Sequence, residues 1–297
     1  GDVTNRDKNI FIKSFRSLSQ LDDYIAIVHV DGKEEYFDPG SRFCPYGHLE
    51  WKHAYAAGLR QTEGGTALFE SPQEPYTASR TQRIGDLTMD LHGLVTGSIR
   101  ITYIGAPALT WRQRSLTGDS TSLEHDLRTS VENLVPSGTD IKVVSIDKLA
   151  DYEQPLTVNF SISGPIGQAT GKRLFVPGDI FMSNAKPLFP DAKRDIPVYF
   201  DYPHMVQDAV RIKYPSGFAV ESSPAPDKFQ FKNLALYTES TAAAPGSITV
   251  RRDFSLGEII YLTTEYPDLR SFYSRIATKD QENIVLTTNP PKTTASN

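Results

Sequence analysis

Short runs of β-branched and aromatic residues, separated by glycine and proline, recur along most of this chain. In the clearest run, residues 95–103, Ile99, Ile101 and Tyr103 alternate with polar residues and would share one face of a strand. Similar runs lie at 80–91, 141–146, 156–163, 197–200, 209–214, 228–237 and 247–254. This spacing predicts a mainly β protein with a large antiparallel, sandwich-type region.

Two short helices are expected to interrupt the strands. In residues 120–135, Leu123, Leu127 and Val131 recur at helical spacing, and a Pro-Ser-Gly triplet follows. Near the C-terminus, Pro267 stands where the first turn of a helix accepts proline, and the apolar pattern continues to about residue 278.

The N-terminal part predicts a β-hairpin. Residues 23–30 are rich in β-branched residues, Asp31-Gly32 is a two-residue hairpin turn, and residues 33–37 return. A polar segment with two prolines, 71–78, predicts a linker. We therefore expect one unit at 1–78 and a second at 79–289. The second unit would hold two subdomains that meet near 190–200, and a disordered tail would follow at 290–297.

Composition excludes several classes of function. The net charge is −5, which argues against a nucleic-acid partner. No run of 18 apolar residues is present, so no membrane span is expected. The sequence carries no phosphate loop, dinucleotide fingerprint or nucleophile elbow, so we expect no cofactor.

The single cysteine, Cys44, is the first candidate for chemistry. A thiol enzyme needs an imidazole and a carboxylate, which His29, His48 and Asp38 would supply. However, Cys44 lies in a turn rather than at a helix N-terminus, so we interpret it as a packed structural residue. Cys44, His48 and His53 also form a loose zinc-ligand pattern without a fourth ligand, and we predict no metal site.

Arginines and aromatic residues form a second candidate site. Tyr103, Trp111 and Arg112 would make a ligand-binding platform if exposed together on a sheet, because aromatic and guanidinium groups stack on ligands. An ordinary solvated sheet face is the alternative. The triplet 251–253 looks like a mixed-sign surface loop.

Several motifs resemble a known family. They are the stretches 31–33, 36–40 and 43–47, followed downstream by 171–174, 197–198, 214–218 and 266–273. In this order they resemble the end of the transglutaminase-like (papain-related) domain of large bacterial exported proteins and the β-rich domain of unknown function that follows it. The resemblance covers nearly the whole chain.

The resemblance implies a Cys-His-Asp triad, of which this chain matches only Asp38. The expected histidine position falls at about Asp23 or Tyr24, and the expected cysteine would lie before Gly1. Cys44 follows Asp38 and does not match it. Without its histidine, an aspartate has no imidazole to orient.

We therefore predict a non-catalytic binding or scaffolding module of a larger cell-envelope or secreted protein. Its partner would be a protein, a peptide or a glycan, and the resemblance implies a periplasmic or extracellular location. One alternative is part of an active thiol peptidase or acyl-transferase whose cysteine lies upstream. Another is a glycan-binding β module that uses exposed aromatic residues.

Overall fold

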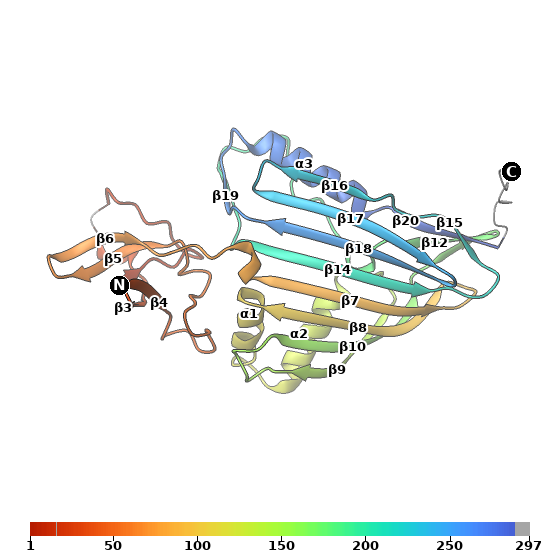
Figure 1. Cartoon of the computed structure of the whole chain (residues 1–297), viewed down its shortest axis with the longest axis horizontal. Helices are drawn as coiled ribbons and strands as arrows, with labels where there is room; N and C mark the ends of the chain where they lie inside the picture. The colour runs from red at the N-terminus through yellow and green to blue at the C-terminus, as the bar shows by residue number, and fades with distance from the viewer. Residues whose placement is uncertain (16, 289–297) are drawn as a thin grey trace.

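A large sheet dominates the computed structural model, which describes residues 1–15 and 17–288 (Figure 1). Its strands are β7 (Arg80–Met89), β8 (Leu94–Ile104), β9 (Asp140–Asp147), β10 (Leu156–Pro165), β14 (His204–Lys213), β16 (Asp227–Phe231), β17 (Ala235–Ala244) and β18 (Ser247–Leu256). These eight strands lie in the order β16-β17-β18-β14-β7-β8-β10-β9. The prediction of a mainly β protein is confirmed, although the run at 228–237 proves to be parts of two strands.

The two central strands, β7 and β14, run parallel, with Asp208 opposite Arg83 and Arg211 opposite Asp86. The other neighbouring pairs in this sheet are antiparallel. The antiparallel prediction therefore fails only at the centre. A parallel pair needs a long crossover, and here more than a hundred residues lie between the two strands.

One face of this sheet is buried and the other faces solvent. In β8, Ile99, Ile101 and Tyr103 are at most 7% exposed, as the alternation predicted. Ser98 and Arg100, which point the other way, are exposed. Period-two alternation in the sequence thus places the core on a single side.

Helix α2 (Ser120–Glu132), the 3-10 turn η3 (Ile180–Met182) and a second sheet share a hydrophobic core with the buried face. The second sheet has the order β11-β12-β20-β15, with strands β11 (Gln168–Thr170), β12 (Arg173–Pro177), β15 (Ala219–Ser222) and β20 (Asn283–Thr287). The predicted stripe of Leu123, Leu127 and Val131 is buried. The helix is confirmed, and the side chain of Asp119 caps its N-terminus by accepting from the backbone N–H of Ser122.

Helix α3 (Tyr266–Asp280) packs on the other end of the large sheet, beside β16 and β17 (Figure 1). Its Leu269, Phe272 and Ile276 join Tyr237 and Phe254 in a second, largely aromatic core. Pro267 lies in its first turn, as predicted. Nearby, the short strand β13 (Val198–Tyr199) pairs with β19 (Ile260–Tyr261).

A third helix, α1 (Ala106–Arg114), corrects the prediction of two. Its sequence has no continuous stripe of apolar residues that repeat at helical spacing. In the structure only Ala108, Leu109 and Arg112 of this helix are buried. The helix begins after Gly105, whose φ of 68° and close approach to the backbone of Ala78 exclude a side chain there. Tertiary contacts rather than periodicity therefore define this helix.

The N-terminal residues form a small sheet and a separate hairpin, at the left of Figure 1. The sheet has the order β2-β1-β5-β6, with strands β1 (Asp2–Val3), β2 (Asp23–Tyr24), β5 (Ala57–Thr62) and β6 (Gly65–Glu70). The hairpin, β3 (Ala26–Val30) and β4 (Lys33–Phe37), is the one that Asp31-Gly32 predicted. Two 3-10 turns complete this part of the chain, η1 (Leu18–Gln20) and η2 (Tyr76–Ala78), of which η2 lies in the expected linker.

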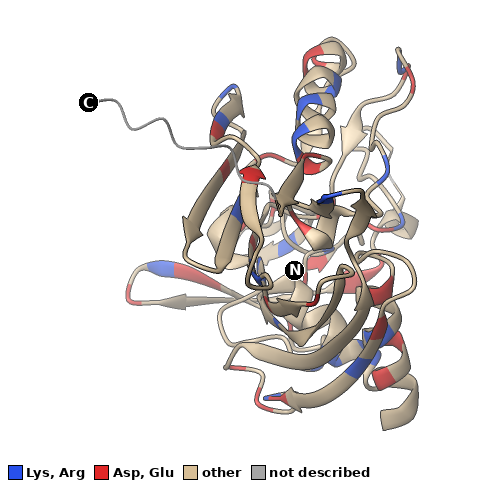
Figure 2. Cartoon of the chain, turned by 90° about the vertical axis from the view of Figure 1, so that its right-hand side faces the viewer, with Lys and Arg blue, Asp and Glu red and all other residues tan. Residues whose placement is uncertain are grey.

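Charged residues of both signs are interspersed along the strands and helices in the view of Figure 2. Within residues 1–15 and 17–288, no helix has the length and apolar character that a bilayer crossing requires. The expected tail at 290–297 lies outside the described residues.

Candidate functional site

Asp38 has an imidazole partner that the sequence did not indicate. It directly follows β4, and its Oδ2 lies 2.5 Å from Nδ1 of His53, in the turn before β5. Both side chains are only 1% exposed. The expectation that Asp38 lacks an imidazole is therefore wrong, although the partner does not come from the position of Asp23 or Tyr24.

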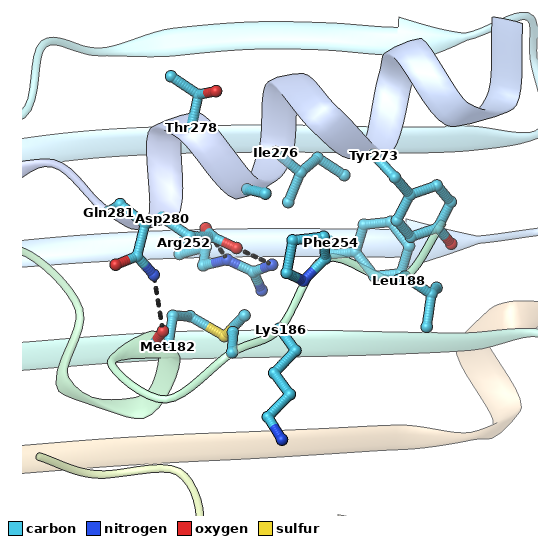
Figure 3. Close-up of a pocket in the computed structure, with 13 residues that line it drawn as sticks. Met182, Lys186, Leu188, Arg252, Phe254, Tyr273, Ile276, Thr278, Asp280 and Gln281 are labelled. Atoms are coloured by element: carbon cyan, nitrogen blue, oxygen red, sulfur yellow. Dashed lines mark hydrogen bonds and ion pairs between the residues drawn. The ribbon is translucent and has the colours of Figure 1, made fainter. Parts of the chain in front are cut away.

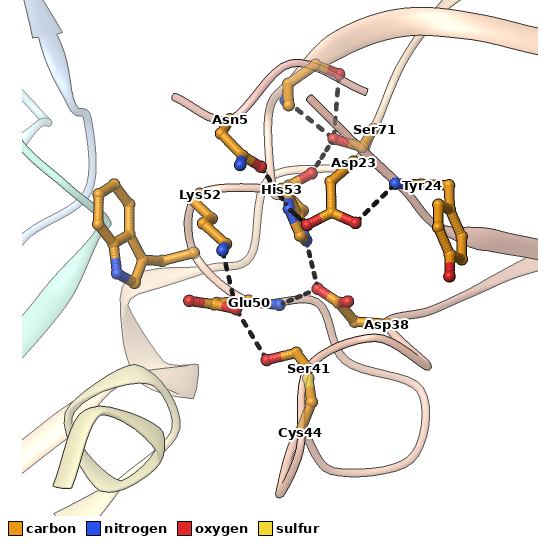
Figure 4. Close-up of polar contacts among 12 residues, drawn as sticks. Asn5, Asp23, Tyr24, Asp38, Ser41, Cys44, Glu50, Lys52, His53 and Ser71 are labelled. Carbon is orange, nitrogen blue, oxygen red and sulfur yellow. Dashed lines mark hydrogen bonds and ion pairs between the residues drawn. The ribbon is translucent and has the colours of Figure 1, made fainter. Parts of the chain in front are cut away.

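The other contacts of this pair tie it into the N-terminal unit (Figure 4). Nε2 of His53 lies 2.6 Å from Oδ1 of Asn5 and 3.4 Å from a carboxylate oxygen of Asp23. The backbone N–H of Glu50 donates to Oδ2 of Asp38 over 3.1 Å. Because both ring nitrogens are engaged, His53 has no free position from which to accept a proton from a nucleophile.

Cys44 lies close to this cluster but is not activated by it. Its Sγ donates to the carbonyl of His48 over 3.4 Å. Burial, followed by the negative charge of Asp38, raises the pKa of the Cys44 thiol. A thiol with a raised pKa stays protonated at neutral pH, which removes the reactivity that a nucleophile needs.

We predict that Cys44 of the native protein reacts with iodoacetamide at least tenfold more slowly at pH 8 than the denatured protein does. The thiolate is the reacting species, and its fraction falls about tenfold for each unit by which the pKa rises. Mass spectrometry of timed samples measures both rates. Equal rates, or a native rate that levels off below pH 8, would contradict the raised pKa.

The residues predicted as a platform do not lie on an open sheet face. Tyr103 is 7% exposed and packs against Trp111, with ring centroids 6.1 Å apart. Arg112 is 2% exposed and donates to the backbone carbonyls of five residues, Lys148, Leu149, Asp151, Tyr152 and Gln154. In this position Arg112 holds the 148–154 loop against α1.

A cavity of about 480 Å³ lies between α3 and the segment 182–188 (Figure 3). Apolar side chains make most of its wall, among them Leu188, Phe254, Tyr273 and Ile276. This volume and this lining are typical of sites that bind small molecules or single side chains. Nothing in the sequence indicates the cavity, because its walls come from segments far apart in the chain.

One buried ion pair lines the cavity, and a second buried ion pair lies next to the first on neighbouring strands. Arg252, which lines the cavity, donates to both oxygens of Asp280 over 2.6 and 3.0 Å. Arg83 makes a similar two-point contact with Asp208 over 2.6 and 2.7 Å. The prediction of a surface loop at 251–253 is wrong, since Arg252 lies in β18 and is 5% exposed.

Asp179 completes this group of charges. Burial, and then the nearby carboxylate of Asp208, raise the pKa of Asp179 well above its ordinary value. Arg83 and Arg252 face the carboxylates of Asp208 and Asp280 in this network, which connects β7, β14, β18 and α3.

Comparison with known proteins bears on the C-terminal part of the chain. A family model described as a domain of unknown function with solved structure, DUF3858, matches residues 172–286. This confirms the expectation of a β-rich domain of unknown function there, whereas the transglutaminase-like assignment stays a prediction. A search of curated proteins found no significant match.

One solved structure resembles the chain distantly. It is described as "a putative protease from Parabacteroides distasonis ATCC 8503", with 11% sequence identity and a TM-score of 0.44. The match covers 91% of this chain and only 36% of that protein. We infer no activity from it.

Proposed function

We propose that this chain is a non-catalytic binding module of a larger exported protein, located in the periplasm or outside the cell. The module would hold a peptide or protein segment of the cell envelope by taking an apolar side chain into the cavity beside α3. The cavity is the observation that carries this proposal, because it is open to a ligand, about 480 Å³ in volume and mostly apolar.

The N-terminal cluster supports the non-catalytic part of the proposal. Asp38 and His53 are buried, His53 is engaged at both nitrogens, and the raised pKa of Cys44 keeps its thiol protonated. A thiol peptidase or acyl-transferase needs the opposite arrangement, with an accessible thiolate beside a free imidazole nitrogen. Peptide hydrolysis or cross-linking by this chain alone would overturn the proposal.

We predict that Ala277→Phe abolishes binding of an apolar fluorescent probe, 8-anilinonaphthalene-1-sulfonate, to the native protein. Ala277 lines the cavity from α3, so a phenyl group there would fill the space. Fluorescence titration at constant protein concentration measures the effect. The wild-type protein should show a saturable increase in fluorescence, and the variant should show little.

Ala243→Phe is the matched control, because Ala243 is an exposed residue of β17 that does not line the cavity. This variant should bind the probe as the wild type does. Equal binding by all three proteins would place the probe elsewhere and would contradict the assignment of the cavity as the binding site.

A further inference from the structure

The cluster around His53 contains a buried carboxylate oxygen with no hydrogen-bond partner. Oδ1 of Asp38 makes no hydrogen bond with any part of the chain that the structure describes, although the side chain is only 1% exposed. The other oxygen, Oδ2, contacts both Glu50 N and His53. A buried carboxylate with an unpaired oxygen is costly unless a positive charge compensates it.

The contacts of His53 indicate which ring nitrogen carries a hydrogen. Nε2 faces Asn5 Oδ1 and a carboxylate oxygen of Asp23, and both are acceptors, so Nε2 donates. In a neutral imidazole, Nδ1 is then also an acceptor, yet it lies 2.5 Å from Oδ2 of Asp38. Two acceptors lie this close only with a proton between them, so an ion that bound both atoms would displace this proton and move the atoms to about 3 Å apart, because its bonds are about 2.0–2.2 Å long.

Glu50 supplies a third ligand at the same place. One potential ligand atom from each of Asp38, Glu50 and His53 lies within 4.8 Å of the others. Small adjustments of these side chains would bring all three atoms to one ion, whose bonds to nitrogen and oxygen are about 2.0–2.2 Å long.

The charge of the cluster favours a divalent ion. Asp23, Asp38 and Glu50 surround a single imidazole, and Lys52 is the nearby cation, with its Nζ 3.6 Å from Glu50. The three carboxylates therefore outnumber the one lysine cation by two, an excess that one divalent ion would balance.

We propose that Asp38, Glu50 and His53 bind a divalent transition-metal ion, of which zinc is the best match. Imidazole with carboxylates suits zinc and related ions, whereas calcium and magnesium prefer sites made of oxygen alone. A histidine that binds a metal through one ring nitrogen usually donates a hydrogen bond from the other nitrogen to a nearby acceptor. In this site His53 would bind the ion through Nδ1, and Oδ1 of Asn5 would accept from Nε2.

The position of the site indicates a structural role. Its ligands come from the end of β4 and from the turn before β5. Ser41 donates to Glu50 over 2.7 Å, and Gln113 of α1 donates to Ser41 over 2.7 Å. An ion bound to Glu50 would therefore stabilise the N-terminal unit and its contact with α1.

The test is binding of zinc or cobalt to the whole chain after treatment with a chelator. We expect one ion per chain, a cobalt absorption spectrum with imidazole coordination, and a higher thermal unfolding midpoint when zinc is added. Glu50→Gln should weaken zinc binding at least about tenfold, because loss of a direct ligand should cost no less than loss of an outer contact. His53→Gln should abolish it.

His48→Gln is the control for adventitious zinc binding. His48 belongs to the same segment but is exposed, and it pairs with Glu74 rather than with the proposed ligands. This variant should bind zinc as the wild type does. The proposal fails if the wild type binds no ion stoichiometrically, if Glu50→Gln binds zinc unchanged, or if His48→Gln loses the ion. If His53→Gln does not fold, Glu50→Gln alone still decides, because Glu50 lies at a partly exposed position.

Discussion

Asp208→Asn is expected to lower the free energy of unfolding by about 3–5 kcal/mol, which is the usual cost of breaking a buried ion pair from one side. The Asp208 side chain is 1% exposed, and both of its oxygens contact Arg83. Arg252 lies 3.6 Å away on the other side. Removal of the carboxylate charge would leave two buried guanidinium groups with too little compensation.

Asp86→Asn provides a control in the same pair of strands. Arg211 contacts both oxygens of Asp86 across β7 and β14, in the same directly opposite register as Arg83 and Asp208. This pair, however, lies on the solvent side, with side chains that are 49% and 38% exposed. Its loss should cost no more than about 1 kcal/mol.

Urea denaturation of the two variants and the wild type measures this difference. Similar costs for Asp208→Asn and Asp86→Asn would mean that burial does not determine the strength of the contact. The assignment of the Arg83–Asp208 pair as a buried link between the two central strands would then be wrong.

Phe181→Ala should lower the free energy of unfolding by a comparable amount, about 3–5 kcal/mol. Phe181 belongs to η3 and is fully buried in the core beneath the large sheet. Its ring also lies against the guanidinium of Arg83, 5.0 Å from the ring centroid. The substitution would therefore leave a cavity and remove the apolar cover of a buried ion pair.

Phe175→Ala is the matched control, because Phe175 is the same residue type in neighbouring β12 but is 37% exposed. We expect it to cost no more than about 1 kcal/mol, since partly exposed positions lose less contact on truncation. The midpoint of urea unfolding distinguishes the two variants. An equal loss for both would show that η3 does not anchor the core.

The features that the sequence predicted are those with a local cause. The hairpin turn at Asp31-Gly32 forms because both residues adopt positive φ, which Asp and Gly tolerate. Helices α2 and α3 were visible because their apolar residues repeat at helical spacing. By contrast, α1 carries no such repeat, and its start depends on the contact between Gly105 and Ala78.

The site residues that the sequence missed depend on distant contacts. His53 meets Asp38 only because two turns fold back toward the end of β4, and no spacing rule predicts that. Arg252 looked exposed because it stands among other charged residues, whereas its partners Asp208 and Asp280 come from another strand and a helix. Tyr103 was placed on the correct strand face, but the sequence could not show that α1 covers it.

The parallel contact of β7 with β14 has a consequence for the order in which the chain folds. It joins positions as far apart as Arg83 and Asp208, 125 residues along the sequence. Strands β7 to β10 are synthesised well before β14, and β7 has an unpaired edge until β14 pairs with it. Such distant pairing slows folding and exposes the nascent chain to aggregation. The strand at the centre of the finished sheet is thus an edge strand of the part of the sheet that is synthesised first.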